Sequence, residues 1–250
     1  MRKILHATFV FLCALSLVVS LEESHASTTT IDESTGFWGQ AVGEGNLSAI
    51  NENLSSVRLW VEGQGRFNNA NPDSNMNWYQ SIARTGLGYA FSDRLTFWLG
   101  YTYSPVKNYN KPFVAEQDFW PAIRYVLPTS IGTITLREWV EFRYAGGDTP
   151  GVRPRTLIRL LHPFSFEPRL GLVIWDEFFF NANNVQDLKT LGLSGFNQNR
   201  AFLGLAWTFS EKIRGEFGYM NNMINTSKEF DPNQRYTMLN NITAVVFFSW

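Results

Sequence analysis

The sequence predicts an all-β fold, an antiparallel up-and-down transmembrane β-barrel, and three observations support this prediction. Apolar and polar residues alternate along most of the chain, as they do in strands with one apolar and one polar face. The connections between these segments are short and long in turn. Arginine, and not lysine, supplies the cations inside the alternating segments.

The composition narrows the class of protein. The chain has 250 residues, of which 44% are hydrophobic, 16% aromatic and 17% charged, with a net charge of -1. Charged residues are scarcer and aromatic residues more abundant than in an average soluble domain. So much apolar surface excludes a disordered chain, and the absence of a basic excess excludes a nucleic-acid partner.

The first residues resemble a cleavable secretory signal. Arg2 and Lys3 precede an uncharged apolar run over 4–21, and small residues at Ser24 and Ala26 suit signal peptidase. We therefore expect a signal peptide over 1–26 and a single barrel domain over 27–250. A retained membrane anchor is the alternative, because the apolar run is just long enough to span a bilayer.

Cleavage would remove the one cysteine of the chain, Cys13, and leave His162 as the last histidine. A secreted chain without cysteine has neither disulfides nor thiolate metal ligands. No metal-ligand spacing and no phosphate-binding glycine loop are present. We therefore expect no metal site and no cofactor.

Eleven segments show the alternation. In 57–67, for example, Val57, Leu59 and Val61 share one face while Arg58 and Trp60 share the other. Most of the segments are long enough to cross a bilayer as tilted strands. Their predicted ranges are 37–47, 54–67, 77–91, 94–104, 114–127, 131–144, 152–164, 169–181, 196–209, 213–225 and 235–250.

Every second connection is long. Short turns fall at 92–93, 128–130, 165–167 and 210–211, and long polar loops fall at 68–76, 105–113, 145–151, 182–195 and 226–234. Outer-membrane barrels have this polarity, with short periplasmic turns and long external loops. The long loops leave open a second function, a surface-binding or adhesion scaffold.

Barrels of this class have even strand numbers, and eleven segments are visible. We expect about 12 strands, with 28–36 adding a short one. The alternative is 10, with the segment 37–47 left out of the wall.

The cations are divided between strands and loops. All five lysines after the signal segment fall in loops or turns, and eleven arginines fall in strands: 58, 66, 84, 124, 137, 143, 153, 155, 159, 200 and 214. The planar guanidinium group suits enclosed ion pairs with carboxylates. We therefore expect the polar faces to line the inside of the barrel. Glu138 and Asp176 depart from this pattern, because both fall on the lipid face unless a bulge shifts the register or a rim lies nearby.

Aromatic residues support a membrane location. Trp207 suits an aromatic girdle, whereas Trp60 and Trp98 lie on the polar face, and core tryptophans of a soluble sandwich are the alternative. The apolar face of the last strand ends on Trp250, which resembles the signature that the barrel-assembly machinery recognises in bacterial outer-membrane proteins. We expect the outer membrane of a Gram-negative bacterium, with its lipid and lipopolysaccharide and the assembly machinery as partners.

An ordered set of motifs also carries a resemblance to a family. The motifs are Arg137-x-x-x-Glu141-x-Arg143, Arg153-x-Arg155, Asp176-Glu177-x-Phe179-x-Asn181, Gln198-Asn199-Arg200 with Gly204, and Gly218-Tyr219. They make the chain similar to an uncharacterised bacterial outer-membrane family, domain of unknown function 2490. The resemblance implies an outer-membrane β-barrel and no particular activity. The sequence departs from the family at Asn240 and Asn241, where we would expect a histidine.

Two functions remain open for the lumen. Arginines and carboxylates interlock and plug a narrow structural barrel, or a basic ladder lines a narrow pore for small anionic solutes. The candidate lumen or anion-facing residues are Arg137, Glu141, Arg143, Arg153, Arg155, Arg159, Glu177 and Arg200.

An enzyme is the less favoured class. Outer-membrane hydrolases use a histidine near the external rim, whereas His162 precedes Pro163 beside a short turn at the other end. Asp176 and Glu177 are adjacent, so their side chains point to opposite faces of a strand. We therefore expect no catalytic residue.

Overall fold

The computed structural model describes residues 29–69, 77–107, 114–144, 149–184, 194–227 and 234–250. The predicted signal peptide over 1–26 lies outside the described residues, as do the larger parts of the long loops, on which the alternative function of a surface-binding or adhesion scaffold depends. Among the described residues, no helix is long and apolar enough to cross a membrane.

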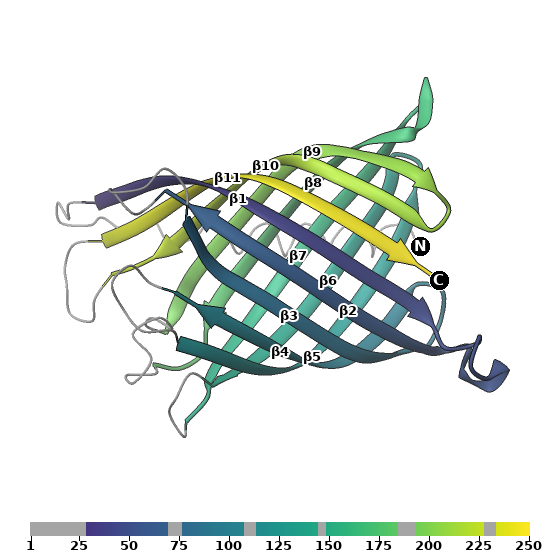
Figure 1. Cartoon of the computed structure of the whole chain (residues 1–250), viewed down its shortest axis with the longest axis horizontal. Helices are drawn as coiled ribbons and strands as arrows, with labels where there is room; N and C mark the ends of the chain where they lie inside the picture. The colour runs from purple at the N-terminus through teal and green to yellow at the C-terminus, as the bar shows by residue number, and fades with distance from the viewer. Residues whose placement is uncertain (1–28, 70–76, 108–113, 145–148, 185–193, 228–233) are drawn as a thin grey trace, which may run out of the picture.

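The described residues form one closed barrel of eleven strands, in which each strand pairs with its neighbours along the chain (Figure 1). The strands are β1 (Thr29–Asn46), β2 (Val57–Asn68), β3 (Asn77–Ala90), β4 (Leu95–Val106), β5 (Val114–Thr129), β6 (Gly132–Tyr144), β7 (Gly151–Phe164), β8 (Glu167–Asn181), β9 (Gly195–Ser210), β10 (Ile213–Asn225) and β11 (Gln234–Ser249). A short 3-10 helix, η1 (Glu52–Leu54), lies between β1 and β2.

The prediction of 12 strands, with 10 as the alternative, is wrong. The stretch 28–36 adds no separate strand, because Thr29–Thr35 continues into the next segment without a turn and β1 is 18 residues long. This strand belongs to the wall, where it pairs with β2 and β11. An odd number of strands closes because β1 and β11 pair in parallel, from Thr29 opposite Gln234 to Glu44 opposite Ser249. A parallel pair satisfies both edges, so closure needs no even count.

The two ends of the barrel differ. Tight connections join β3 to β4, β5 to β6, β7 to β8 and β9 to β10, and all of them lie at one end, which we call the short-turn end (Figure 1). The turn before β6 uses Gly132 at a φ of 127°, where a Cβ atom would strike the Leu161 carbonyl. The chain ends at the short-turn end, whereas β1 starts at the opposite end.

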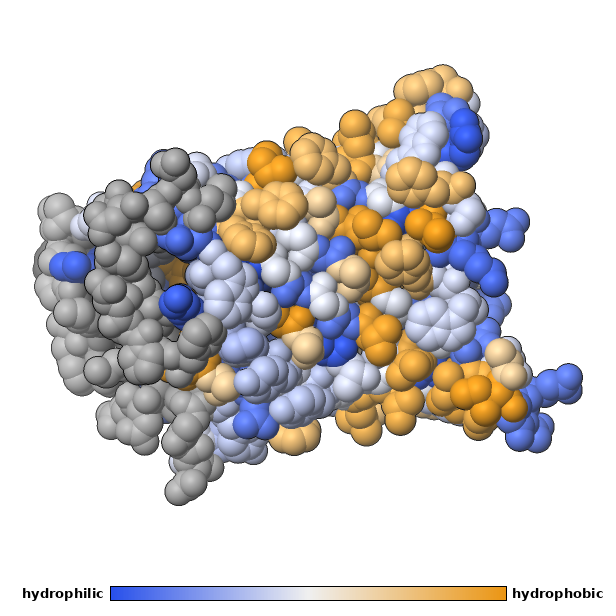
Figure 2. All heavy atoms as spheres, viewed as in Figure 1, coloured by the Kyte–Doolittle hydropathy of each residue, from blue (hydrophilic) through white to orange (hydrophobic). Residues whose placement is uncertain are grey.

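The alternation places large apolar side chains outside, whereas the inside holds the charged side chains of the strands together with two buried clusters of aromatic and aliphatic groups. Leu99, Phe119 and Phe217 are 57%, 55% and 61% exposed on the outer face. On the same strands Thr102, Asp118 and Glu216 are buried. Figure 2 shows apolar residues across the wall and hydrophilic residues gathered at the short-turn end. A soluble sandwich would instead turn its charged side chains to solvent and keep large apolar side chains off its outer face.

The two acidic residues that depart from the predicted pattern, Glu138 and Asp176, do lie on the outer face. No bulge occurs at Glu138 or Asp176, so the predicted register shift does not explain why they point outward. A rim position does not explain it for Glu138 either, because Glu138 is the central residue of β6. Each carboxylate instead accepts a hydrogen bond from the adjacent strand, Glu138 from the Thr156 hydroxyl at 2.8 Å and Asp176 from Asn199 Nδ2 at 2.5 Å. These local hydrogen bonds therefore lower the free-energy cost of placing a carboxylate on an apolar outer face.

Candidate functional site

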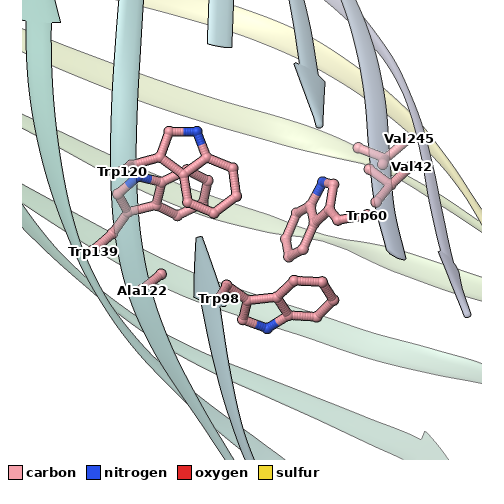
Figure 3. Close-up of a cluster of buried hydrophobic side chains, with 7 residues drawn as sticks. All are labelled: Val42, Trp60, Trp98, Trp120, Ala122, Trp139 and Val245. Atoms are coloured by element: carbon pink, nitrogen blue, oxygen red, sulfur yellow. The ribbon is translucent and has the colours of Figure 1, made fainter. Parts of the chain in front are cut away.

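Four indoles meet inside the barrel and form the tryptophan layer, namely Trp60 of β2, Trp98 of β4, Trp120 of β5 and Trp139 of β6 (Figure 3). The ring centroid of Trp60 lies 5.4 Å from that of Trp98 and 6.2 Å from that of Trp139, and the Trp120 and Trp139 centroids are 4.1 Å apart. Strands β2 and β6 are not neighbours, so the layer reaches across the lumen. As predicted, Trp60 and Trp98 lie on the inward face.

Inward-facing glycines make room for the tryptophan layer. A Cβ atom at Gly88 would lie 2.6 Å from the Trp98 ring, and one at Gly86 would lie 2.8 Å from the Trp120 ring. A Cβ at Gly100 would overlap the Trp120 ring as well. These strand glycines therefore mark close approach of a neighbouring side chain.

Beside the tryptophan layer, strands β6 to β8 carry an ion-pair network. Glu141 accepts from Arg153 Nε at 2.7 Å and from Arg155 Nη1 at 2.6 Å. Glu177 accepts from Arg155 Nη2 at 2.6 Å and from Arg137 Nη2 at 2.9 Å. Arg155 thus joins both carboxylates, and every member is enclosed by the barrel.

The remaining predicted site residues extend this arrangement. Arg143 binds the carboxylate of Glu116 with two nitrogens, at 2.6 and 2.8 Å. Arg200 Nη1 lies 3.7 Å from Glu177, which is too far for a hydrogen bond. Arg159 pairs with Glu216 away from the network. All five arginines of the predicted basic ladder are therefore ion-paired, namely Arg137, Arg143, Arg153, Arg155 and Arg159.

Two ion pairs tie walls that are far apart in the sheet. Arg159 of β7 reaches Glu216 of β10, and Arg124 of β5 reaches Glu44 of β1, with Nη1 and Oε2 2.5 Å apart. Neither pair of strands is adjacent in the barrel. The ion pairs therefore cross the lumen, as the tryptophan layer does.

A cavity of about 560 Å³ remains between these groups. Its wall includes Ser210, Lys212 and Ser249 at the short-turn end, and it reaches inward to Trp38 and Arg66. Nine cationic side chains line it, against the five carboxylates Glu44, Glu62, Glu177, Glu211 and Glu216. The cations are Arg66, Arg84, Arg124, Arg137, Arg155, Arg159, Arg200, Lys212 and Arg214. The formal charge of the lining is therefore +4.

The inner part of the cavity holds two arginines beside one indole. The Cζ atoms of Arg66 and Arg200 lie 3.8 and 5.1 Å from the Trp38 ring centroid. Arg66 donates to the amide oxygens of Gln64, at 2.7 and 3.1 Å, and Gln80, at 2.7 Å. No carboxylate of the described residues lies within ion-pair distance of Arg66. We call Arg66, Arg200 and Trp38 the arginine cradle.

Sequence reasoning placed Arg66 among the strand arginines but not among the site residues, and it missed Glu44 and Trp38. The in-and-out alternation predicts Arg66 on the inward face, and it could have placed Trp38 there as well. Nothing in the local pattern pairs Glu44 with Arg124, because 80 residues separate them. Of the two asparagines that replace the expected histidine, Asn241 is buried inside, whereas Asn240 accepts from Tyr219 on the outer face.

The groups considered for catalysis do not converge. His162 Nδ1 lies 2.6 Å from the Ile131 carbonyl oxygen beside a short turn. Glu177 is buried in the ion-pair network, whereas Asp176 lies on the outer face with Asn199. The two adjacent acids are therefore on opposite sides of the wall.

Comparison with known proteins assigns the chain to a family and to no function. No curated protein and no solved structure matches the chain. A family model described as "Protein of unknown function (DUF2490)" matches residues 35–234, which extends from within β1 to the start of β11. The chain therefore belongs to the DUF2490 family of proteins of unknown function.

Proposed function

We propose that this protein is an integral outer-membrane β-barrel whose lumen is closed to free diffusion and contains an anion-binding cavity open at the short-turn end. The observation that carries the proposal is the cavity itself, whose lining has a formal charge of +4 beside groups that cross the lumen. We favour this function over a narrow anion pore.

The outer face supports a lipid environment. Large apolar side chains such as Leu87, Leu203 and Phe217 are more than half exposed, at 58%, 55% and 61%. A water-facing wall of this kind would be an aggregation site, whereas lipid solvates it. All strands close on one another, so no backbone edge is left unsatisfied in hydrocarbon.

The last strand supports a route into the membrane. Ile242, Val246 and Phe248 point outward on β11 and are 43%, 37% and 44% exposed, and Trp250 follows them at the chain end. We propose that this apolar face is read by the barrel-assembly machinery and then contacts outer-membrane lipid, including lipopolysaccharide.

Closure of the lumen argues for binding and against conduction. Ions that crossed the barrel would have to pass the tryptophan layer and separate cross-lumen ion pairs such as Arg124–Glu44. Separation of an enclosed ion pair leaves uncompensated charge, which is strongly unfavourable. We also propose a binding role in place of a catalytic one, because His162 is held at a turn.

Reconstitution into planar bilayers tests this function. The unmodified protein should show no steady single-channel conductance at any voltage or salt concentration. The double variant Trp60→Ala with Trp139→Ala, which removes half of the tryptophan layer, should conduct. Steady, anion-selective currents from the unmodified protein would refute the closed lumen.

The membrane assignment has its own test. The protein should stay with the membrane fraction until detergent is added, and unheated samples should migrate differently on gels from boiled ones. Release by salt or alkali alone would contradict an integral barrel.

A further inference from the structure

We propose that the arginine cradle binds the oxyanion group, phosphate or carboxylate, of a small solute that enters the cavity from the short-turn end. This inference rests on the proposed anion-binding cavity and names the residues and the ligand chemistry inside it. Unbalanced charge, available hydrogen-bond donors and the space of the cavity each support it.

The charges around the cradle do not balance. Glu177 is shared by Arg137, Arg155 and, at 3.7 Å, Arg200. Glu62 is engaged by Arg84 at 2.6 Å. Arg66 is held by the neutral amides of Gln64 and Gln80. Arg155 also shares Glu141 with Arg153, so six arginines share three carboxylates, and enclosed like charges need a counterion.

The hydrogen-bond donors of the cradle suit an oxyanion. A guanidinium group presents five N–H donors in a planar fork that matches carboxylate or phosphate oxygens. Gln198, with its amide oxygen turned toward Arg200, accepts from Nε and Nη2 and fixes that fork at 2.9 and 3.0 Å. Trp38 is only 6% exposed, and its Nε1 forms no well-aligned hydrogen bond with a described residue, although the Tyr79 hydroxyl lies beside both Trp38 and Arg66. A buried donor of this kind at the cavity wall is available to an oxyanion held between the two guanidinium groups.

The cavity provides space and access. Trp38, Arg66 and Arg200 all line it, and so do residues of the β9–β10 turn. Its volume of about 560 Å³ falls within the range of roughly 300–1,000 Å³ that small-molecule sites occupy. The oxyanion would sit at the inner end, and the rest of the solute would extend toward the short-turn end.

Calorimetric titration of the full-length protein in a nonionic detergent tests the inference, with inorganic phosphate and succinate as the two probes at low ionic strength. The unmodified protein should bind at least one probe saturably. Arg66→Gln and Arg200→Gln should each weaken that binding by about tenfold or more, since hydrogen bonds to charged groups are lost. Arg169→Gln is the matched control, because it removes the same charge from an exposed pair with Glu167 and should leave binding unchanged.

Two conservative variants keep the test decisive if a glutamine variant fails to fold. Arg66→Lys retains the charge but loses the planar fork, and Trp38→Phe retains a ring but loses Nε1. Both should bind the probe more weakly while the unheated gel migration of the barrel is preserved. Undiminished binding in both would overturn the inference.

The other outcomes separate the cradle from the wider proposal. Binding that survives Arg66→Gln and Arg200→Gln but is lost in Arg159→Gln or Arg214→Gln overturns the cradle and leaves an anion-binding cavity. Equal loss in Arg169→Gln overturns it by showing that only overall charge matters. No binding of either probe overturns both the cradle and the proposed function.

Discussion

Two regions of the barrel interior use arginine in opposite ways. In the ion-pair network of β6 to β8, Arg153 and Arg155 hold Glu141, and Arg137 and Arg155 hold Glu177. In the arginine cradle, Arg66 donates to the amide oxygens of Gln64 and Gln80 and has no carboxylate of the described residues within ion-pair distance. An arginine that faces a carboxylate on a nearby strand forms an ion pair and stiffens the barrel. An arginine that faces only neutral amides keeps its charge uncompensated, and we propose that it is therefore available to an anionic ligand.

The largest expected effect comes from breaking the network at its most shared carboxylate. Glu177→Gln leaves three arginines short of a counter-charge and should lower the free energy of unfolding by about 3–5 kcal/mol. Urea unfolding of the lipid-reconstituted barrel measures the change. Glu167→Gln, which breaks an exposed pair at a turn, should have little effect, and a similar loss in both variants would contradict the comparison.

A smaller effect tests the tight packing next to the network. Gly100→Ala forces a methyl group into the Trp120 ring and should cost about 1–3 kcal/mol of unfolding free energy. Gly63 is the control, because a Cβ atom there meets nothing within 4 Å, so Gly63→Ala should be nearly neutral. Equal stability of the two variants would show that the tryptophan layer is loosely packed.

The cradle should tolerate change better than the network does. Arg66→Gln removes hydrogen bonds to neutral amides and leaves no carboxylate unpaired, so the loss should be about 1 kcal/mol. The same urea titration checks it against Glu177→Gln. A loss as large as that of Glu177→Gln would mean that Arg66 is structural and not held for a ligand.

The smallest effect is expected for a carboxylate on the outer face, in contrast to the enclosed carboxylate of Glu177. Glu138→Leu removes an acid from the outer face and should stabilise the barrel in lipid by about 1 kcal/mol or less, because its hydrogen bond to Thr156 is lost as well. The gain should appear in lipid vesicles. Destabilisation there would indicate that this face contacts water or a polar partner.

The sequence predicts which side chains face inward, because a period of two is a local property that each segment displays by itself. It did not predict the strand count, because the parallel pairing of β1 with β11 joins the two ends of the barrel and leaves no local mark. Partners across the lumen are equally hidden, since Arg124 and Glu44 meet only when the barrel closes. The sequence therefore predicts which residues belong to the ion-pair network but not how they pair. The arginine cradle, and the absence of a carboxylate next to Arg66, can be recognised only in the closed barrel.

The proposed function depends on the apolar face of the strands contacting lipid and the polar face lining the lumen. Single cysteine variants can test this orientation, because the chain has no cysteine after Cys13. A fluorophore attached at Leu99→Cys on the outer face of β4 should be strongly quenched by brominated lipid, and one at Thr208→Cys, which lines the cavity, should not. Stronger quenching from position 208 than from position 99 would contradict the account.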